Sequence, residues 1–372
     1  MGLANASAAP LAAPAAKPVF SSIQTLRGIA ALLIVLMHLA SMERAAGAGH
    51  VLLPDFFRHA YGGVDLFFVI SGFVMVTVAR GRYRSPTEAR RFLARRAWRI
   101  YPTYWVYTSV LVAAIALSRG VSGFPYDAAQ IAKSYLLLPQ EKGPMLAVGW
   151  TLVHELYFYL VGALAIAFVP ERRVAWFLLG WGALTSVAYA LAPVDFSPWL
   201  TVIASPLTWE FIAGAMIALY AQRLPRALAP WCAALGAAGL FASFLVAREL
   251  TSVHAAGALR AALYGPVSAL LVLGMAAWEG RPGGLRLPAL PVALGDASYS
   301  LYLSHPLIIF ALVRVWRHGL TPWMHDASVI ACIVACIVFS LASYRWLEKP
   351  LLAFGERRLF PRRPPAPALQ PA

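Results

Sequence analysis

Ten long apolar stretches constrain the fold of this chain more than any other feature of its sequence. Crossing the ~30 Å hydrocarbon layer of a bilayer takes about 20 residues of α-helix, at a rise of ~1.5 Å per residue. The stretches lie close to residues 26–42, 62–79, 102–118, 148–169, 174–192, 200–220, 228–247, 260–277, 292–315 and 327–346. The sequence therefore predicts an all-α fold, a polytopic membrane bundle of about ten transmembrane helices.

The composition excludes most other fold classes. Apolar and aromatic residues make up 60% of the chain and charged residues only 13%, against roughly 45–50% and about 25% in soluble domains. Such a chain has too little polar surface to stay in water. The three cysteines, Cys232, Cys332 and Cys336, lie inside apolar stretches without CxxC spacing. They predict small core side chains, with neither a disulfide framework nor a metal site.

The positive charge of the chain predicts its orientation. The formal net charge is +15, from 31 Lys and Arg against 16 Asp and Glu. A basic protein can bind nucleic acid, but cytoplasmic loops of membrane proteins are also enriched in Lys and Arg. Four alternating connections and the two tails hold 20 of these residues, whereas the other five connections hold eight. We therefore expect both termini in the cytoplasm and no nucleic-acid partner.

The domain organisation predicted is one membrane domain between two tails. Residues 1–20 are rich in Ala and Pro and lack the features of a signal peptide, and residues 353–372 form a basic, Pro-rich tail. We expect residues 1–19 and 361–372 to be disordered and residues 21–352 to form the transmembrane domain. Because every connection is short, any chemistry must lie inside the bundle or at its faces.

Ionisable side chains inside the apolar stretches are the first candidates for function. Each costs roughly 2.5–3.5 kcal/mol on insertion scales, so its presence in a membrane helix needs a reason. The candidates are Arg27, His38, Asp65, His154, Glu155, Glu210 and His305. For Glu210, a structural role remains the main alternative.

Arg27 and His38 lie in the first stretch, eleven residues apart. Eleven residues make three helical turns plus about 20°, so both side chains project from one face, roughly 16 Å apart along the axis. A ligand long enough to reach both would suit this arrangement. The alternative is an arginine that reaches the membrane surface and a histidine satisfied within the core.

Asp65 and Glu155 lie near the expected outer ends of the second and fourth stretches. Helical rise places both within a turn or two of the depth of His38. A carboxylate beside an imidazole raises its basicity and fixes its tautomer, as a general base requires. His38, Glu155 and Asp65 are therefore the predicted catalytic group. For Asp65 the alternative is an acid favoured by the helix dipole, and His154 is a weaker candidate because it points about 100° away from Glu155.

Two further clusters carry polar side chains suited to ligands. Arg96 and Arg99 precede the third stretch, and arginines bind phosphates in bidentate fashion, although an anchor at the cytoplasmic face is the simpler explanation for such a cluster. Tyr302 and His305 share one face of the ninth stretch, where Pro306 kinks the helix. They line a substrate cavity or form hydrogen bonds between helices.

The residues around these candidates resemble the motifs of the membrane acyltransferase-3 family. Six ordered blocks carry the resemblance: Leu26–Gly28 with His38, Gly63–Phe73, Arg95–Pro102, Trp150–Tyr159, Ser298–Pro306 and Leu347–Pro350. They extend from about residue 22 to 352, and the bare bundle looks most like the exopolysaccharide-acetylating branch. Two positions depart from the common pattern, namely His154 before Glu155 and Ser304 before His305, and both could affect the choice of acceptor.

The resemblance implies an acyltransferase of the bacterial plasma (inner) membrane. Such an enzyme moves an acyl group, usually acetyl from acetyl-CoA and without a metal, to a hydroxyl of an envelope carbohydrate or lipid-linked glycan. It implies that Arg27, Arg96 and Arg99 hold the CoA phosphates and that Trp150, Tyr302 and His305 contact substrate.

The mechanism and the acceptor both keep alternatives at this point. His38 would act as general base, supported by Glu155 or Asp65, or as a transient acyl-histidine. The acceptor could instead be a small molecule such as a macrolide. A transporter that moves acyl groups or glycolipids without transferring them is the alternative outside enzymes.

Overall fold

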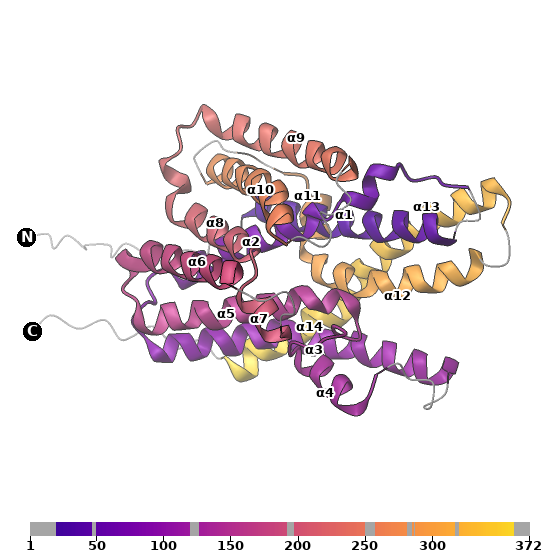
Figure 1. The fold of residues 1–372 in the computed structure, drawn as a ribbon, viewed down its shortest axis with the longest axis horizontal. Helices are drawn as coiled ribbons and strands as arrows, with labels where there is room; N and C mark the ends of the chain where they lie inside the picture. The colour runs from indigo at the N-terminus through magenta and orange to yellow at the C-terminus, as the bar shows by residue number, and fades with distance from the viewer. Residues whose placement is uncertain are drawn as a thin grey trace, which may run out of the picture.

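The structure is a computed structural model that describes residues 20–46, 50–119, 126–191, 197–249, 257–280, 285, 287–316 and 320–360. The predicted disordered segments, 1–19 and 361–372, lie outside these residues. Every regular element within the described ranges is helical (Figure 1). Ten helical stretches there are long and apolar enough to cross a membrane. The predicted all-α class and the ten spans are confirmed.

The helices follow the predicted apolar stretches and add four short helices, α4, α7, α11 and α14. In chain order they are α1 (Ser21–Ala46), α2 (Gly62–Ala79), α3 (Pro86–Arg119), α4 (Ala128–Leu136), α5 (Trp150–Phe168), α6 (Val174–Leu191), α7 (Pro198–Ile203), α8 (Thr208–Tyr220), α9 (Leu228–Glu249), α10 (Gly257–Glu279), α11 (Ala289–Asp296), α12 (Ser298–Trp316), α13 (Pro322–Ser343) and α14 (Lys349–Phe354). Two π-helical segments, η6 (Tyr344–Glu348) and η7 (Gly355–Leu359), continue α13 and α14. Residues 353–359, assigned to the tail from the sequence, are therefore helical.

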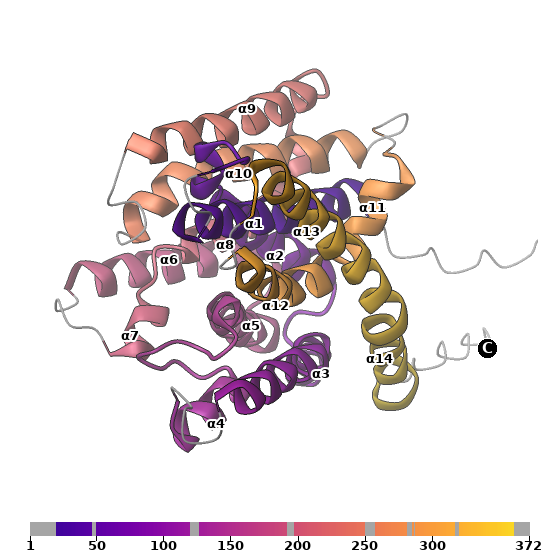
Figure 2. The same ribbon diagram turned by 90° about the vertical axis from the view of Figure 1, so that its right-hand side faces the viewer.

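The core of the bundle depends on close helix contacts at small residues. A Cβ built on Gly214 of α8 would lie 1.7 Å from the carbonyl oxygen of Val69, and one on Gly72 of α2 would lie 1.9 Å from that of Phe211. Only glycine allows these two backbones to approach so closely, which is how helices associate in membranes, where lipid tails are as apolar as leucine. Figure 2 shows α1, α2, α5 and α12 in the middle, with α9 and α10 on one side and α3 and α4 on the other.

The helices are staggered along the bundle. A Cβ on Gly63, at the start of α2, would lie 2.6 Å from the carbonyl oxygen of Ala30 in the middle of α1. The start of α5 packs similarly against α3, where Gly149 faces the ring of Tyr104. In Figure 1, α12, α13 and the ends of α1 and α3 extend to the right, beyond α5 and α6. α2 and α5 therefore begin deeper along the bundle than counting residues from a common outer surface predicts.

The start of α1 is fixed by polar contacts with distant helices. The backbone N–H groups of Ser21 and Ser22 donate to the carboxylate of Glu279, at the end of α10, at 2.7 and 2.8 Å. One turn later, Gln24 donates from its amide to Asp296 of α11 at 2.8 Å. Unpaired N–H groups at a helix start are satisfied in this way, and the turn that carries Arg27 is held in place.

The first and last spans begin and end on the same side of the bundle. Phe20, just before α1, stacks edge-on against Phe73 of α2. The end of α2, at Ala79, lines a cavity with Glu356 of the last span. An even number of spans requires this arrangement.

Candidate active site

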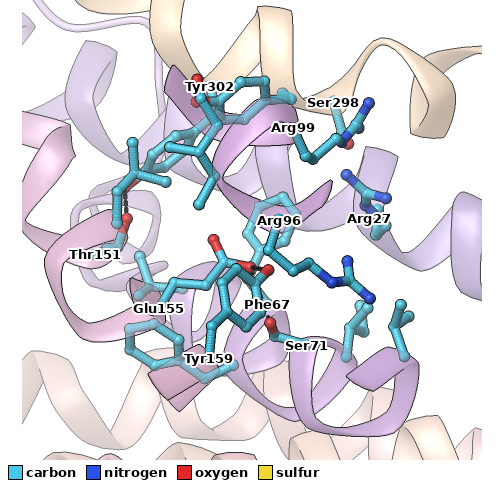
Figure 3. A pocket seen from close by; sticks show the side chains of 17 residues that line it. Arg27, Phe67, Ser71, Arg96, Arg99, Thr151, Glu155, Tyr159, Ser298 and Tyr302 are labelled. Carbon is cyan, nitrogen blue, oxygen red and sulfur yellow. Dashed lines mark hydrogen bonds between the residues drawn. The ribbon is translucent and has the colours of Figure 1, made fainter. Parts of the chain in front are cut away.

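A polar cavity lies between α1, α2, α3, α5 and α12 (Figure 3). It contains about 790 Å³ of empty space, including its open mouth. Five of the predicted site residues line it: Arg27 from α1, Arg96 and Arg99 from α3, Glu155 from α5 and Tyr302 from α12. Residues up to 275 positions apart in the sequence thus share one cavity.

Arg99 is positioned by a carboxylate to which the sequence analysis gave no role. Glu348 is completely buried and forms an ion pair with Arg99 at 2.8 Å. It also accepts a hydrogen bond of 2.7 Å from Ser300 of α12, and the Arg99 guanidinium lies over the ring of Tyr299 at 5.8 Å. An acid at the end of the last apolar stretch, within the Leu347–Pro350 block, was the available sequence signal.

Arg96 is held by aromatic rings rather than by a carboxylate. Its guanidinium lies 5.4 Å from the ring centre of Phe92 and 5.2 Å from that of Tyr159. In the part of the chain that the structure describes, it forms no ion pair. A cation oriented by two rings, with its hydrogen-bond donors unused by acids, is well suited to bind an anion.

Glu155 faces this cavity at the level of Arg27, not at that of His38. Its Oε1 accepts hydrogen bonds from Ser71 of α2, at 2.9 Å, and from the hydroxyl of Tyr159. The stagger of α5 explains the difference from the predicted depth. Glu155 and the three arginines therefore act on the same space (Figure 3).

His38 pairs with His305. Nδ1 of His38 lies 3.2 Å from Nε2 of His305, and the ring centres are 5.0 Å apart. Each Nδ1 also lies close to the carbonyl oxygen four residues earlier, at 3.0 Å from that of Ile34 and 3.1 Å from that of Leu301. The sequence analysis did not foresee the pair, because the two residues are 267 positions apart.

The histidine pair lies directly behind the cavity wall. The ring of Tyr302, which lines the cavity, is 6.0 Å from that of His305. The Tyr302 hydroxyl lies 2.8 Å from Oγ1 of Thr151 and donates to the carbonyl of Val148, also at 2.8 Å. Tyr302 thus separates the arginine-lined space from the two imidazoles.

Asp65 pairs with Arg260 of α10 and does not line the cavity. Its carboxylate is completely buried and accepts hydrogen bonds from Arg260 of α10, from Nε at 3.2 Å to each oxygen and from Nη2 at 2.8 Å. The expectation that Asp65 supports the imidazole of His38 therefore needs correction. The first turn of α2 faces α10, where the guanidinium of Arg260 neutralises the carboxylate. Arg260 lies in the first turn of α10.

Trp150 and His154 lie on the same side as Asp65 and Arg260. The guanidinium of Arg260 lies 5.4 Å from the ring centre of Trp150, and the rings of Trp150 and His154 are 5.5 Å apart. Neither lines the polar cavity. Glu210, the remaining predicted candidate, is buried in α8 and packs against Gly265 of α10. Within the described residues, no three His, Cys, Asp or Glu side chains gather in a way that could hold a metal ion.

Comparison with known proteins gives a consistent set of relatives. Residues 20–345 match the family described as acyltransferase domain. Exopolysaccharide production protein ExoZ of Rhizobium meliloti (strain 1021) is 34% identical over 309 residues, covering 80% of this chain and 90% of that protein. Nodulation protein 10 of Rhizobium leguminosarum bv. viciae is 27% identical, covering 78% and 82%. Acyltransferase MdmB of Streptomyces mycarofaciens is 26% identical, covering 94% and 95%.

No solved structure matches the chain. The family match nevertheless spans all of the helices that line the polar cavity. It includes every residue that the sequence analysis proposed for the site. The chain therefore belongs to the membrane acyltransferase-3 family and is a multi-pass membrane acyltransferase.

Proposed function

We propose that this protein is an O-acetyltransferase of the bacterial inner membrane. It transfers acetyl from acetyl-CoA, bound from the cytoplasm, to a hydroxyl of an envelope carbohydrate or lipid-linked glycan, and both of its termini are cytoplasmic. The carrying observation is the cavity that joins Arg27, Arg96, Arg99 and Glu155, with a histidine pair behind Tyr302. The similarity to ExoZ, an exopolysaccharide production protein, supports a carbohydrate acceptor.

The arginines bind the donor. CoA carries a diphosphate, and guanidinium groups hold phosphate oxygens through paired hydrogen bonds. Arg27 lies three helical turns from His38 on the same helix, so an extended donor bound at Arg27 directs its thioester toward His38.

The histidine pair sets the tautomer of the base. Each Nδ1 faces a carbonyl oxygen, so both neutral rings carry their proton on Nδ1. The unprotonated Nε2 of His305 then shares the Nδ1–H of His38 with the carbonyl oxygen of Ile34, and the lone pair of His38 Nε2 has no partner within the described part of the chain. His38 is thereby ready to remove a proton.

The reaction follows from that lone pair. Nε2 of His38 takes the proton of the acceptor hydroxyl while its oxygen attacks the thioester carbon. The C–S bond breaks, and the proton passes to the leaving thiolate to give free CoA and an acetyl ester. In the variant mechanism Nε2 itself attacks the thioester, the C–S bond breaks and CoA leaves as a thiolate. The acceptor hydroxyl then attacks the acetyl carbon, the N–C bond to histidine breaks, and the hydroxyl proton passes to the thiolate. Of the two predicted carboxylates, Glu155 rather than Asp65 is available to a ligand, because Glu155 lines the cavity while Asp65 is bound by Arg260.

Thiol release tests the function. Purified protein in nanodiscs receives acetyl-CoA, and free CoA is followed for the wild type, His38→Ala and, as a matched control, His50→Gln, which alters a histidine paired with Asp326 outside the cavity. We expect slow release by the wild type and the control, acceleration by the right acceptor, and none by folded His38→Ala. Normal release by folded His38→Ala would refute both mechanisms.

Two alternatives give different outcomes in the same assay. A transporter without transferase activity consumes no acetyl-CoA, so wild-type protein that neither binds CoA nor releases thiol would favour transport or another donor. A small-molecule acceptor, such as a macrolide, keeps the CoA release but changes the product. The similarity to Acyltransferase MdmB over 94% of the chain makes this worth testing by mass spectrometry of acetylated products.

A further inference from the structure

A second cavity adjoins the first beside the end of the last span. It contains about 960 Å³ of empty space, including its opening, between the ends of α2, α3 and α5 and the last span. Arg82 and Arg95 line it alone, whereas Arg96 and Arg99 line both cavities. The two cavities are therefore neighbours along α3.

The second cavity has an excess of positive charge. Four arginines line it against two carboxylates, Glu88 and Glu356. The ion pairs of these acids within the cavity are long, at 4.0 Å for Arg82 with Glu88 and 3.5 Å for Arg95 with Glu356. Nε of Arg95, the atom of that 3.5 Å ion pair, is buried and forms no hydrogen bond. Loosely paired guanidinium groups fit a ligand that carries several negative charges.

The first cavity alone is poorly supplied for such a ligand. Arg99 already has a close partner in Glu348 at 2.8 Å, and Glu155 faces Arg27 across the same space. Within the described part of the chain, Arg96 and Arg27 have no carboxylate partner, and Arg27 donates only to the amide oxygen of Gln24 at 3.4 Å. A diphosphate with a further phosphate monoester of about −1.5 to −2 charges needs the additional cations of the second cavity.

Aromatic rings complete the second cavity. The guanidinium of Arg95 lies over the ring of Phe360 at 5.6 Å. Trp98 is fixed by a 2.9 Å hydrogen bond from its indole N–H to the carbonyl of Leu351 and packs against Phe354. Flat rings beside cations are the combination on which nucleobases stack next to their phosphates.

We propose that the second cavity binds the 3′-phospho-ADP end of the acyl donor. The diphosphate then lies at Arg96 and Arg99, which line both cavities, and the pantetheine arm passes Arg27 in the first cavity and carries the thioester toward His38. This assignment rests on the proposed use of acetyl-CoA and names the residues that recognise its nucleotide. Arg82 and Arg95 are binding residues for the phosphates, although neither lines the first cavity.

Binding of CoA fragments tests this assignment. Isothermal titration in nanodiscs compares CoA, dephospho-CoA and pantetheine on the wild type, Arg82→Gln, Arg95→Gln and the control Arg90→Gln, which removes an exposed arginine of the same helix outside the cavity. We expect the wild type and control to bind CoA most tightly. Arg82→Gln and Arg95→Gln should each weaken CoA binding about tenfold, lose much of the preference for CoA over dephospho-CoA, and leave pantetheine binding unchanged.

The outcomes separate this assignment from the proposed function. Unaltered CoA binding by both folded variants, or an equal loss for CoA and pantetheine, would overturn the nucleotide site while leaving the donor intact. An equal loss in Arg90→Gln would reduce the effect to general attraction by positive charge and would also overturn the site. Wild-type protein that does not bind CoA would refute the donor and the nucleotide site together. Thermal melting of each variant confirms that it is folded.

Discussion

Two arginines of this bundle pair with completely buried carboxylates but have different surroundings. Arg260 and Asp65 are joined by three hydrogen bonds, and neither lines a cavity among those described above. Arg99 and Glu348 are as close, at 2.8 Å, yet Arg99 opens onto two cavities beside the unpaired Arg96. A charge inside a membrane helix therefore does not by itself mark a site. A functional site also needs a cavity, and a charged side chain in it that is not already paired with the opposite charge.

The largest effect is expected for Asp65 and Arg260, the pair that lines neither cavity. Asp65→Asn removes the hydrogen-bonded counter-charge of Arg260 and leaves only the more distant Glu210 beside it, and breaking such a pair costs about 3–5 kcal/mol. Thermal melting in nanodiscs should show the loss. The double change Asp65→Leu with Arg260→Leu should recover much of the stability and retain CoA release. A stable double variant without any release would instead place Asp65 in the chemistry.

A change at Glu348 should affect both stability and donor binding, because Glu348 fixes Arg99, which lines both cavities. Glu348→Gln keeps a partner for Ser300 but removes the charge that fixes Arg99, which should cost about 2 kcal/mol of stability. The KM for acetyl-CoA should rise several-fold, with a smaller change in kcat. Steady-state thiol release measures both constants. A fall in kcat alone would mean that Glu348 acts on the chemical step rather than through Arg99.

Arg96 should show the opposite pattern to Asp65. Its guanidinium has no carboxylate partner in the described part of the chain, so Arg96→Gln should leave the melting temperature nearly unchanged. The affinity for CoA should fall about tenfold, or ~1.4 kcal/mol. Titration calorimetry and thermal melting on one preparation compare the two effects. Strong destabilisation with normal CoA binding would mean that Arg96, like Arg260 and Asp65, stabilises the bundle and does not bind the donor.

The smallest effect is expected at the wall between the cavity and the histidines. Tyr302→Phe keeps the ring but removes the hydroxyl that bonds to Val148 and Thr151, which should cost about 1 kcal/mol. CoA binding should be preserved, because the arginines are untouched. Loss of CoA binding in this variant would show that the hydroxyl contacts the donor directly.

Sequence reasoning predicted the spans and most of the cavity for identifiable reasons. Apolar length defines membrane helices, so ten spans could be predicted. Arg27, Arg96, Arg99, Glu155 and Tyr302 stood out because polar groups in such helices are expensive, and the structure places all five around one space.

The partners of these residues were harder to predict. Helical rise gives positions along one helix but not the stagger between helices. For that reason Glu155 and Asp65 were both expected at the same membrane depth as His38, where either could support its imidazole. The pairs His38 with His305, Arg260 with Asp65 and Arg99 with Glu348 each join distant segments of the chain. Only the packing of α1 on α12, α2 on α10 and α3 on the last span brings them together.

A cryo-electron microscopy structure with bound CoA tests most directly whether the two arginine-lined cavities hold the donor. The predicted result is density for the nucleotide beside Arg82 and Arg95, for the diphosphate at Arg96 and Arg99, for the arm past Arg27, and for the thiol near Nε2 of His38. Density for CoA outside both cavities, or against Arg260 and Asp65, would contradict the assignment of the arginine-lined cavities as the donor site.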